Sequence, residues 1–432
     1  MTCMDGCRKG PVTGVPPRDV VVIGMGIRTA LGTGVSVFTD ALWSGTSGIS
    51  HGAHDGLGVA ARVGGLDFVP SLAAMGLEDE LAARARRAAS RAPRAAQVSI
   101  IATLEAWGTM GRAAREIEPR HVHLVVGGSN LELLHTYQMH EKFLAAPEYV
   151  PARYALTWMD THLVGVVSEV LQLRGEGLTV GGASASGNVA LIEGQRRVAS
   201  GRCEVCVILG PMTDLSPVEL RALQHTGALG GIRDDVGAAE ACRPFDQGRD
   251  GFIYGQGAAC VILASRECAE ALGVTVDGRI LGGAMCLDGN HLSDPSAEGE
   301  RRAMQLALED AGIGADDVDY VNAHATSSVL GDMTELQALD EVFQGGSRPV
   351  WVNGTKSFTG HCLSAAAVVE AVGVLVQLKQ GFLHRNLNLT SPLDTRCQLV
   401  GTSTKEVSCR LALSNAFGFG GINTSVVIGA AL

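Results

Sequence analysis

Residues 179–187 read Thr-Val-Gly-Gly-Ala-Ser-Ala-Ser-Gly, and this stretch decides how the rest of the chain is interpreted. The small residues predict a tight loop, and the segment 190–199 that follows predicts a helix. Ser184 therefore stands at a helix start, where backbone N–H groups and the helix dipole favour negative charge. Serine is also a common residue at helix N-termini, so the position alone leaves a structural and a chemical role open.

On both sides of this loop, short apolar runs rich in β-branched residues alternate with longer segments rich in Ala, Leu and Glu. This alternation predicts an α/β fold in which helices cover parallel sheets. The expected strands are 20–23, 122–126, 205–209, 260–263, 280–281, 318–321, 350–352, 411–413 and 425–428, and the expected helices are 190–199, 298–311, 335–342 and 365–379.

A weak internal repeat is present. A second small-residue loop, 355–364, leads into an Ala/Val-rich helix just as the Ser184 loop does. The repeat predicts a flexible tail over 1–18, followed by two similar halves over 19–265 and 266–432. Both loops are expected to meet where the two halves touch.

The composition limits the class of protein. The chain has 432 residues, 46% of them hydrophobic and 18% charged, which predicts a folded core. A net charge of −11 argues against a general nucleic-acid binder, and no apolar run of about 18 residues predicts a membrane span. Eleven scattered cysteines favour reduced thiols in the cytoplasm. The pair Cys203 and Cys206 lacks a second pair, so no metal site is expected.

Several further motifs carry polar side chains that could act in catalysis. Taken alone, each histidine in them is more often an ordinary polar residue than a catalyst. In chain order the motifs are Phe245-Asp-Gln-Gly-Arg-Asp-Gly251, Asn322-Ala-His324-Ala-Thr326-Ser-Ser328 followed by Asp332 and Glu335, Lys356-Ser-Phe-Thr-Gly-His361 followed by Glu370, and Ser414-Asn-Ala-Phe-Gly-Phe-Gly-Gly421.

In this order and spacing the motifs resemble those of the β-ketoacyl synthase family, and the resemblance runs from Val20 to Ile428. It implies a thiolase-like fold with five layers, α-β-α-β-α, built from two similar halves. It also implies a homodimer, with the strands after the nucleophile helix near the dimer interface. In that family a cysteine stands at position 184 and accepts the acyl chain, whereas this chain has serine. The chain also has Ala325 where the family usually has glycine.

The resemblance implies roles for the other residues. His324 and His361 would donate hydrogen bonds to a thioester oxygen, and Lys356 would hold Glu370 and the histidines in place. The N–H groups of Ser184 and Phe419 would form an oxyanion hole, with the Phe419 ring gating the acyl channel. The expected substrate-binding residues are Thr326, Ser328, Phe417, Gly418 and Gly420, and the expected supporting residues are Glu370, Asp332 and Glu335.

Plainer roles stay open for three of these groups. Lys356 could be a surface lysine, and the loop around Phe419 could be only a tight turn between strands. Asp332 and Glu335 could be a pair that satisfies donors at a helix N-terminus.

The serine at position 184 decides the expected activity. The chain most resembles the stand-alone ketosynthases of polyketide β-branching cassettes, in which serine replaces cysteine and malonyl-carrier protein is decarboxylated to acetyl-carrier protein. This implies an acyl carrier protein as partner and no cofactor or metal beyond the phosphopantetheine arm of that carrier. One alternative is an acyltransferase or condensing enzyme that uses Ser184 as nucleophile. Another is a non-catalytic subunit resembling a chain-length factor, which predicts loss of the histidines and the lysine.

One basic cluster stands out against the acidic total. It is either a solvated helix face or a docking patch for an acidic carrier protein, and it comprises Arg84, Arg86, Arg87, Arg91 and Arg94.

Overall fold

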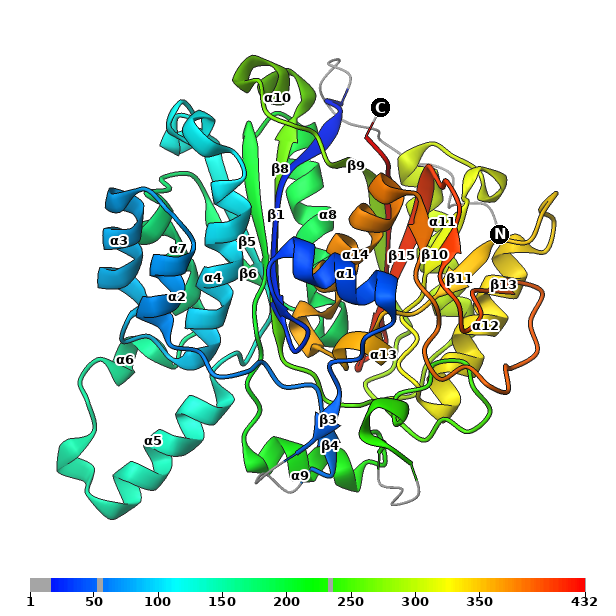
Figure 1. Ribbon diagram of the computed structural model, residues 1–432, viewed down its shortest axis with the longest axis horizontal. Helices are drawn as coiled ribbons and strands as arrows, with labels where there is room; N and C mark the ends of the chain where they lie inside the picture. The colour runs from blue at the N-terminus through cyan, green and yellow to red at the C-terminus, as the bar shows by residue number, and fades with distance from the viewer. Residues whose placement is uncertain (1–16, 53–56, 232–235, 432) are drawn as a thin grey trace, which may run out of the picture.

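The computed structural model describes residues 17–52, 57–231 and 236–431, so residues 1–16 of the predicted tail lie outside it. Twelve strands form one hydrogen-bonded sheet made of two half-sheets (Figure 1). The half-sheets join where β1 (Val20–Thr29) meets β9 (Gly278–Leu287), through only two residue pairs, Val21 with Arg279 and Val22 with Gly278. Strand pairing therefore contributes little to holding the halves in position.

Each half-sheet has the same strand order. One half runs β1-β8-β7-β5-β6, and the other runs β9-β16-β15-β10-β11, with β13 added at its end. The fold therefore consists of two similar halves, while the exact boundary at residue 265 stays a prediction. The remaining strands are β5 (Val122–Gly127), β6 (Gly177–Val180), β7 (Val205–Gly210), β8 (Gly257–Ser265), β10 (Tyr320–Asn322), β11 (Trp351–Asn353), β13 (Gln398–Leu399), β15 (Leu411–Gly418) and β16 (Ile422–Gly429).

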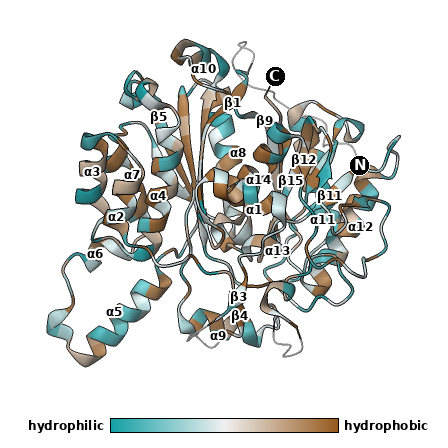
Figure 2. Ribbon diagram, in the orientation of Figure 1, coloured by the Kyte–Doolittle hydropathy of each residue, from teal (hydrophilic) through white to brown (hydrophobic). Residues whose placement is uncertain are grey.

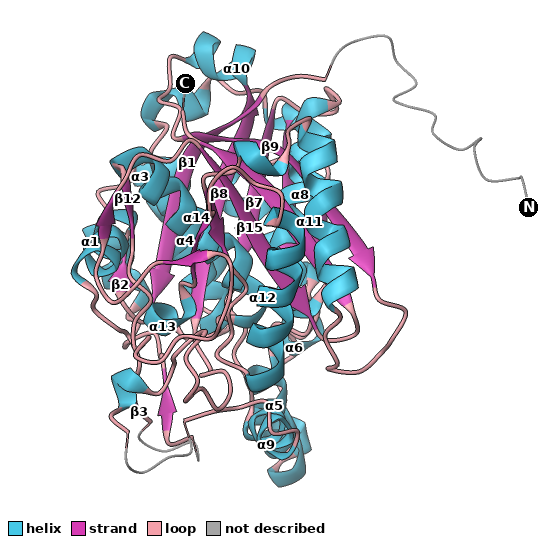
Figure 3. Cartoon of the chain, turned by 90° about the vertical axis from the view of Figure 1, so that its right-hand side faces the viewer, coloured by secondary structure: helices cyan, strands magenta, loops and turns pink. Residues whose placement is uncertain are grey.

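Helices cover the half-sheets in three layers. Helices α8 (Ser186–Ala199) and α14 (Ala366–Gln380) lie side by side between the half-sheets (Figure 1). The outer face of one half-sheet is covered by α4 (Arg94–Gly108), and that of the other by α11 (Ala297–Ala311), as Figure 3 shows for the second. The predicted five layers are thus confirmed. Further outer helices are α3 (Asp79–Ala89), α7 (Thr161–Leu171) and α12 (Val329–Phe343).

The two central helices are packed without room for an extra methyl group. A β-carbon added at Gly187 of α8 would lie 2.8 Å from the backbone nitrogen of Val368 and 3.0 Å from the β-carbon of Ala367, both in α14. Thirteen residues of α14, from Ala366 to Leu378, are buried without a break. The apolar colouring of the inner strands and helices in Figure 2 follows the same layers. These contacts set the position of one half against the other.

Within the described ranges, one helical stretch, Leu363–Gln380, is long and apolar enough to cross a membrane. In this protein 83% of it is buried inside the fold, which is the environment of a core helix.

The sheet differs from the expected parallel arrangement, and that expectation is corrected here. Pairs such as β5–β7 and β10–β15 are parallel, whereas β1–β8, β7–β8 and β15–β16 are antiparallel. The β15–β16 pair is antiparallel because a hairpin, rather than a crossover helix, joins the two strands.

Several strands are also longer than predicted. Strand β1 continues from Ile23 to Thr29 because Gly24 and Gly26, which suggest a turn, leave bare backbone for α4 to approach. A β-carbon at Gly26 would lie 2.0 Å from the carbonyl oxygen of Ala102 in α4.

A helical arm projects from the body of the protein at the lower left of Figure 1. It consists of α5 (Leu133–Ala145) and α6 (Tyr154–Thr157) with the turn between them. The other short elements are α1 (Val35–Ser44), α2 (Phe68–Ala74), α9 (Pro217–His225), α10 (Arg266–Leu272), α13 (Lys356–Thr359), β2 (Gly32–Thr33), β3 (Ser50–His51), β4 (Val59–Ala60), β12 (Phe382–Leu383) and β14 (Lys405–Glu406).

Candidate active site

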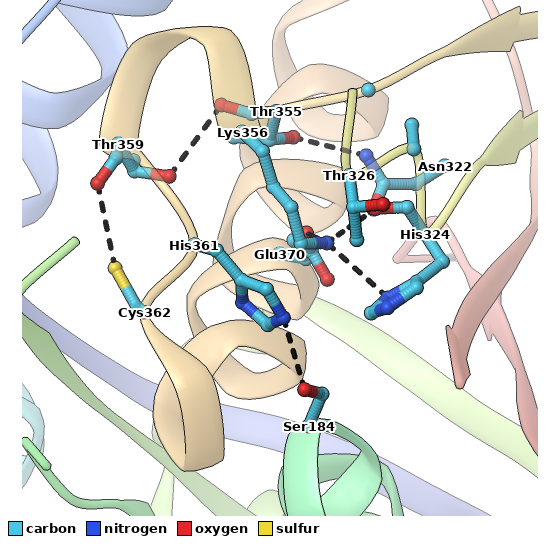
Figure 4. Close-up of polar contacts among 12 residues, drawn as sticks. Ser184, Asn322, His324, Thr326, Thr355, Lys356, Thr359, His361, Cys362 and Glu370 are labelled. Carbon is cyan, nitrogen blue, oxygen red and sulfur yellow. Dashed lines mark hydrogen bonds and ion pairs between the residues drawn. The ribbon is translucent and has the colours of Figure 1, made fainter. Parts of the chain in front are cut away.

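Ser184 lies in a single 3-10 turn, Ala183–Ala185, directly before α8. The turn is held by Ser186, whose hydroxyl accepts a hydrogen bond from Gly182 N–H at 2.9 Å and donates one to Ala183 O at 2.7 Å. Ala183 has φ +49°, a left-handed conformation that costs a residue with a β-carbon about 1–2 kcal/mol. Backbone strain of this kind is common at functional sites, and here it turns the Ser184 hydroxyl toward His361 (Figure 4).

His361 is fixed in one tautomer by the backbone. Leu363 N–H donates a hydrogen bond to Nδ1 of His361 at 3.2 Å, so this nitrogen carries a lone pair and no proton. The proton of the neutral ring is therefore on Nε2, which lies 2.9 Å from Oγ of Ser184. The imidazole donates to the hydroxyl and has no free lone pair with which to remove its proton.

His324 is held in the same protonation pattern by a different group. Nζ of Lys356, which can only donate, lies 3.3 Å from Nδ1 of His324 and also binds the His324 carbonyl oxygen. The two imidazole rings are almost perpendicular, with centroids 5.5 Å apart. Burial, reinforced by the Lys356 ammonium, lowers the pKa of both imidazoles well below the usual value, so both rings are neutral at pH 7.

Lys356 is not a surface lysine, because only 1% of it is exposed. Its Nζ lies 2.5 Å from Oε1 of Glu370, which is equally buried. Burial raises the pKa of Glu370 to about 7, and the nearby ammonium works against that rise. Both residues lie behind the histidines rather than at the cavity wall (Figure 4).

Asp332 and Glu335 project from α12 onto the His324 loop. Glu335 accepts hydrogen bonds from the N–H groups of His324 and Ala325, both at 2.8 Å. Asp332 accepts from Ser327 N–H at 3.0 Å and from Phe245 N–H at 2.8 Å. The donors at the start of α12 are served instead by Ser328, which accepts from Gly331 N–H. Thus the two carboxylates hold a strained loop, in which Ala325 has φ +42° and Ser327 has φ +70°.

The loop around Phe419 is the turn of the β15–β16 hairpin. Phe417 is buried and packs edge-on against His324, with ring centroids 5.6 Å apart. Phe419 is 48% exposed, and a β-carbon on Gly418 would lie 3.4 Å from the Ser184 nitrogen. The hairpin therefore borders the Ser184 turn, and Gly420, at φ +89°, allows it to reverse.

A cavity of about 680 Å³ brings most of the expected residues together. Its wall includes Ser184, both histidines, Thr326, Ser328, Phe417, Gly418, Phe419, Asp332 and Glu335, but not Gly420, Lys356 or Glu370. Thr326 and Ser328 share a hydrogen bond of 2.9 Å between their hydroxyls.

Apart from the two histidines, the carboxylic acids are the groups of this wall that can carry a charge near neutral pH. Among the described residues that line the cavity there is no lysine or arginine. Glu300 and Asp288, which the sequence did not single out, each have one oxygen without a hydrogen-bond partner. Neither residue belongs to one of the motifs described above. In the sequence, Glu300 is an ordinary charged residue of a predicted helix.

The arginine cluster is divided by the fold. Arg84 is paired with Glu80 at 2.9 Å, and Arg94 donates to Val63 O at 2.7 Å. Arg86, Arg87 and Arg91 are exposed. Elsewhere in the described chain, no group of three or more His, Cys, Asp or Glu residues could hold a metal ion.

The arrangement suits stabilisation of an oxyanion. The wall of one cavity holds two neutral imidazoles, whose Nε2–H groups can donate, and the start of α8, and such donors can stabilise an oxygen that gains negative charge. The same site is poor at generating a nucleophile, since nothing adjacent to Ser184 is free to take its proton.

Known proteins share these features along almost the whole chain. The β-ketoacyl synthase N-terminal domain family matches residues 17–269, and the C-terminal domain family matches residues 278–390. The polyketide biosynthesis malonyl-ACP decarboxylase PksF of Bacillus subtilis is 36% identical over 95% of this chain and 96% of its own. The chloroplastic 3-oxoacyl-[acyl-carrier-protein] synthase I of Arabidopsis thaliana is 30% identical over 96% of this chain and 87% of its own.

Among solved structures, the ishigamide ketosynthase/chain length factor superposes with a TM-score of 0.85 at 26% identity. The match covers 96% of this chain and all of that one. The likeness supports the same fold in both proteins.

Proposed function

This chain belongs to the β-ketoacyl synthase family, and we propose that it decarboxylates malonyl-acyl carrier protein to acetyl-acyl carrier protein in polyketide biosynthesis. The observation that carries the proposal is the hydrogen bond from His361 to the Ser184 hydroxyl. It leaves both imidazole donors in place while position 184 holds neither a thiolate nor an activated alkoxide. Such a site stabilises an enolate but does not accept an acyl chain.

The reaction starts when the phosphopantetheine arm carries malonyl thioester into the cavity. The thioester oxygen binds the Nε2–H groups of His324 and His361, or the N–H groups of Ser184 and Phe419. The C–C bond between C2 and the carboxylate breaks, and CO₂ leaves. The electron pair of this bond stays with C2 and is delocalised onto the thioester oxygen, which forms an enolate. Preorganised donors at such an oxygen are each worth about 3–4 kcal/mol. Protonation of the enolate carbon gives acetyl thioester.

The lining of the cavity favours loss of the carboxylate. A malonyl carboxylate that enters the cavity meets no cationic group of the described wall, and the acids there, such as Glu300, whose pKa is raised by burial, offer it no positive charge. The one nearby ammonium, on Lys356, is shielded behind His324. The ionised carboxylate is thus poorly stabilised, whereas the developing oxyanion faces hydrogen-bond donors.

The carrier protein is proposed to dock on the exposed arginines at the end of α3 and in the turn that follows it. Carrier proteins that present acidic surfaces would be attracted to Arg86, Arg87 and Arg91. Replacing Arg86 and Arg87 by Glu should raise the apparent KM for malonyl-carrier protein several-fold and leave kcat unchanged. The matched control is Arg410→Glu, an exposed arginine of the other half. An unchanged KM in the double variant contradicts this docking site.

A second copy of the chain is proposed to cover the exposed edge of the sheet. The strand at that edge is β6, which precedes α8, whereas β7, which follows α8, lies inside the sheet between β5 and β8. We therefore propose β6 as the strand of the interface, in place of the strands after α8. The neighbouring arm exposes large apolar side chains, namely Phe143, Leu144, Tyr149, Leu156 and Trp158. An open edge beside an apolar patch suits symmetric strand pairing. A Leu144→Glu, Trp158→Glu variant should sediment as a monomer.

We propose a cytoplasmic location, which the free thiols of the nine described cysteines support.

Intact-protein mass spectrometry after incubation with malonyl-carrier protein tests the proposed activity. Decarboxylation predicts that the carrier loses the mass of CO₂ while this protein gains none. An acyl adduct that disappears in Ser184→Ala would favour an acyltransferase or condensing enzyme. No change in either protein would favour a non-catalytic partner subunit, a role for which the retained His324, His361 and Lys356 have no use.

A further inference from the structure

The proposed decarboxylation has a chemical requirement that condensation lacks. In condensation the enolate carbon attacks an acyl group, whereas here it must receive a proton. Neutral imidazoles that donate to the oxygen hold that oxygen, so the carbon needs a separate donor. The site therefore raises the question of which atom supplies this proton.

The hydrogen bonds around Ser184 identify an available O–H group. Because Leu363 N–H occupies Nδ1 of His361, the Nε2 proton of that ring points at Oγ of Ser184. The hydroxyl is thus an acceptor toward His361, and its own proton is directed elsewhere. None of the described residues accepts that proton, and the Ser184 side chain lines the cavity.

The position of the hydroxyl suits the enolate carbon. An oxygen bound at Nε2 of His361 has the enolate carbon two bonds away, within about 2.5 Å of it. Oγ of Ser184 is 2.9 Å from the same nitrogen, so the substrate oxygen and Oγ share the one Nε2–H group in a bifurcated hydrogen bond. A substrate oxygen that shares this N–H group therefore brings the enolate carbon near the Ser184 hydroxyl.

We infer that Ser184 is a catalytic residue that donates its hydroxyl proton to the enolate carbon. This inference rests on the proposed function. After the bond between the carboxylate and C2 breaks and CO₂ leaves, a C2–H bond forms with the Ser184 proton and the O–H bond breaks. The alkoxide accepts the hydrogen bond from His361, lies near the start of α8, and takes a proton from water in the cavity. The net reaction consumes one solvent proton.

The stereochemistry of protonation tests this role. Malonyl-carrier protein with one deuterium at C2 in a single configuration is turned over in tritiated water, and the chirality of the acetyl methyl group is measured. The wild-type protein should give one configuration in large excess. Ser184→Ala should release CO₂ within about tenfold of the wild-type rate, because bond cleavage precedes proton transfer, but give nearly racemic acetyl groups.

The matched control is Ser129→Ala, which removes another hydroxyl from the same cavity and should keep the excess. Retained stereochemical purity in Ser184→Ala, or a racemic product from the wild-type protein, would overturn the role of Ser184. Absence of CO₂ release from the wild-type protein would instead overturn the proposed function, so the two failures are distinct.

Discussion

The Ser184 loop and its counterpart in the other half have nearly the same backbone but carry different chemistry. Each is a single 3-10 turn that leads into a central helix, Ala183–Ala185 into α8 and Leu363–Ala365 into α14. Each begins with a left-handed residue, Ala183 at φ +49° and Leu363 at φ +51°. Ser184 and Ser364 follow these residues directly. Three residues before Ser364 stands His361, whereas three before Ser184 stands Gly181.

The difference shows how a repeated fold makes a one-sided site. The C-terminal half supplies both imidazoles, the buried ammonium and the carboxylates that hold them. The Ser184 loop of the N-terminal half supplies one hydroxyl, a helix start and, at Gly181, no side chain. Removing a group from the C-terminal half should therefore affect activity more than removing one from the Ser184 loop.

The largest effect is expected for His324→Ala. Loss of one preorganised donor should lower kcat for CO₂ release by at least about 100-fold, because the enolate oxygen loses its partner. Ser184→Ala, from the other loop, is the comparison and should lose less than about tenfold. Steady-state CO₂ release measures kcat of both variants. Equal losses of kcat would mean that the two halves contribute equally to catalysis.

A large effect on stability is expected for Lys356→Met. It leaves Glu370 buried without its partner, which should lower the free energy of unfolding by about 3–5 kcal/mol. The double variant Lys356→Met, Glu370→Gln should recover part of that loss. Urea unfolding followed by circular dichroism measures the three proteins, and a double variant no more stable than the single one would contradict the pairing.

A moderate, pH-dependent effect is expected from Asp332. Burial raises the pKa of Asp332 from 3.8 to about 7, so the folded protein binds this proton more tightly than the unfolded chain does. Its contribution to stability is therefore full below pH 3.8 and is lost as the pH rises toward 7. The free energy of unfolding of the wild type, relative to Asp332→Asn, should fall over this range. A difference independent of pH would mean that Asp332 is ionised throughout.

The smallest effect is expected for Ala183→Gly. Glycine adopts positive φ without the β-carbon penalty, which should raise the free energy of unfolding by about 0.5–1 kcal/mol. The control Ala190→Gly, in the interior of α8, should lower it by at least about 1 kcal/mol. If both variants lose stability, the left-handed residue is not strained, and the likeness of the two loops has another cause.

The sequence predicted the layers and the motif residues but not the pairing of the strands. Two glycines close together, Gly24 and Gly26, suggest that the strand ends there. The sequence does not show that both glycines are needed inside β1 because α4 packs directly against them. The site motifs could be recognised because their spacing is local. The tautomer of His361 could not be predicted, since it depends on a left-handed backbone at Leu363 that brings an N–H group onto the ring.

The two loops are assembled across a seam with very little tolerance. Only two pairs of residues link β1 and β9, so the close contact of Gly187 with Ala367 and Val368 helps to set the distance between the hydroxyl and the imidazole. The substitution Gly187→Ala is therefore expected to push α8 and α14 apart and to lengthen the distance between Ser184 and His361. Residue 187 does not itself line the cavity. The packing of the core helices thus helps to determine how Ser184 and His361 are aligned. A substitution in the core can therefore abolish activity although the substituted residue contacts no reacting atom.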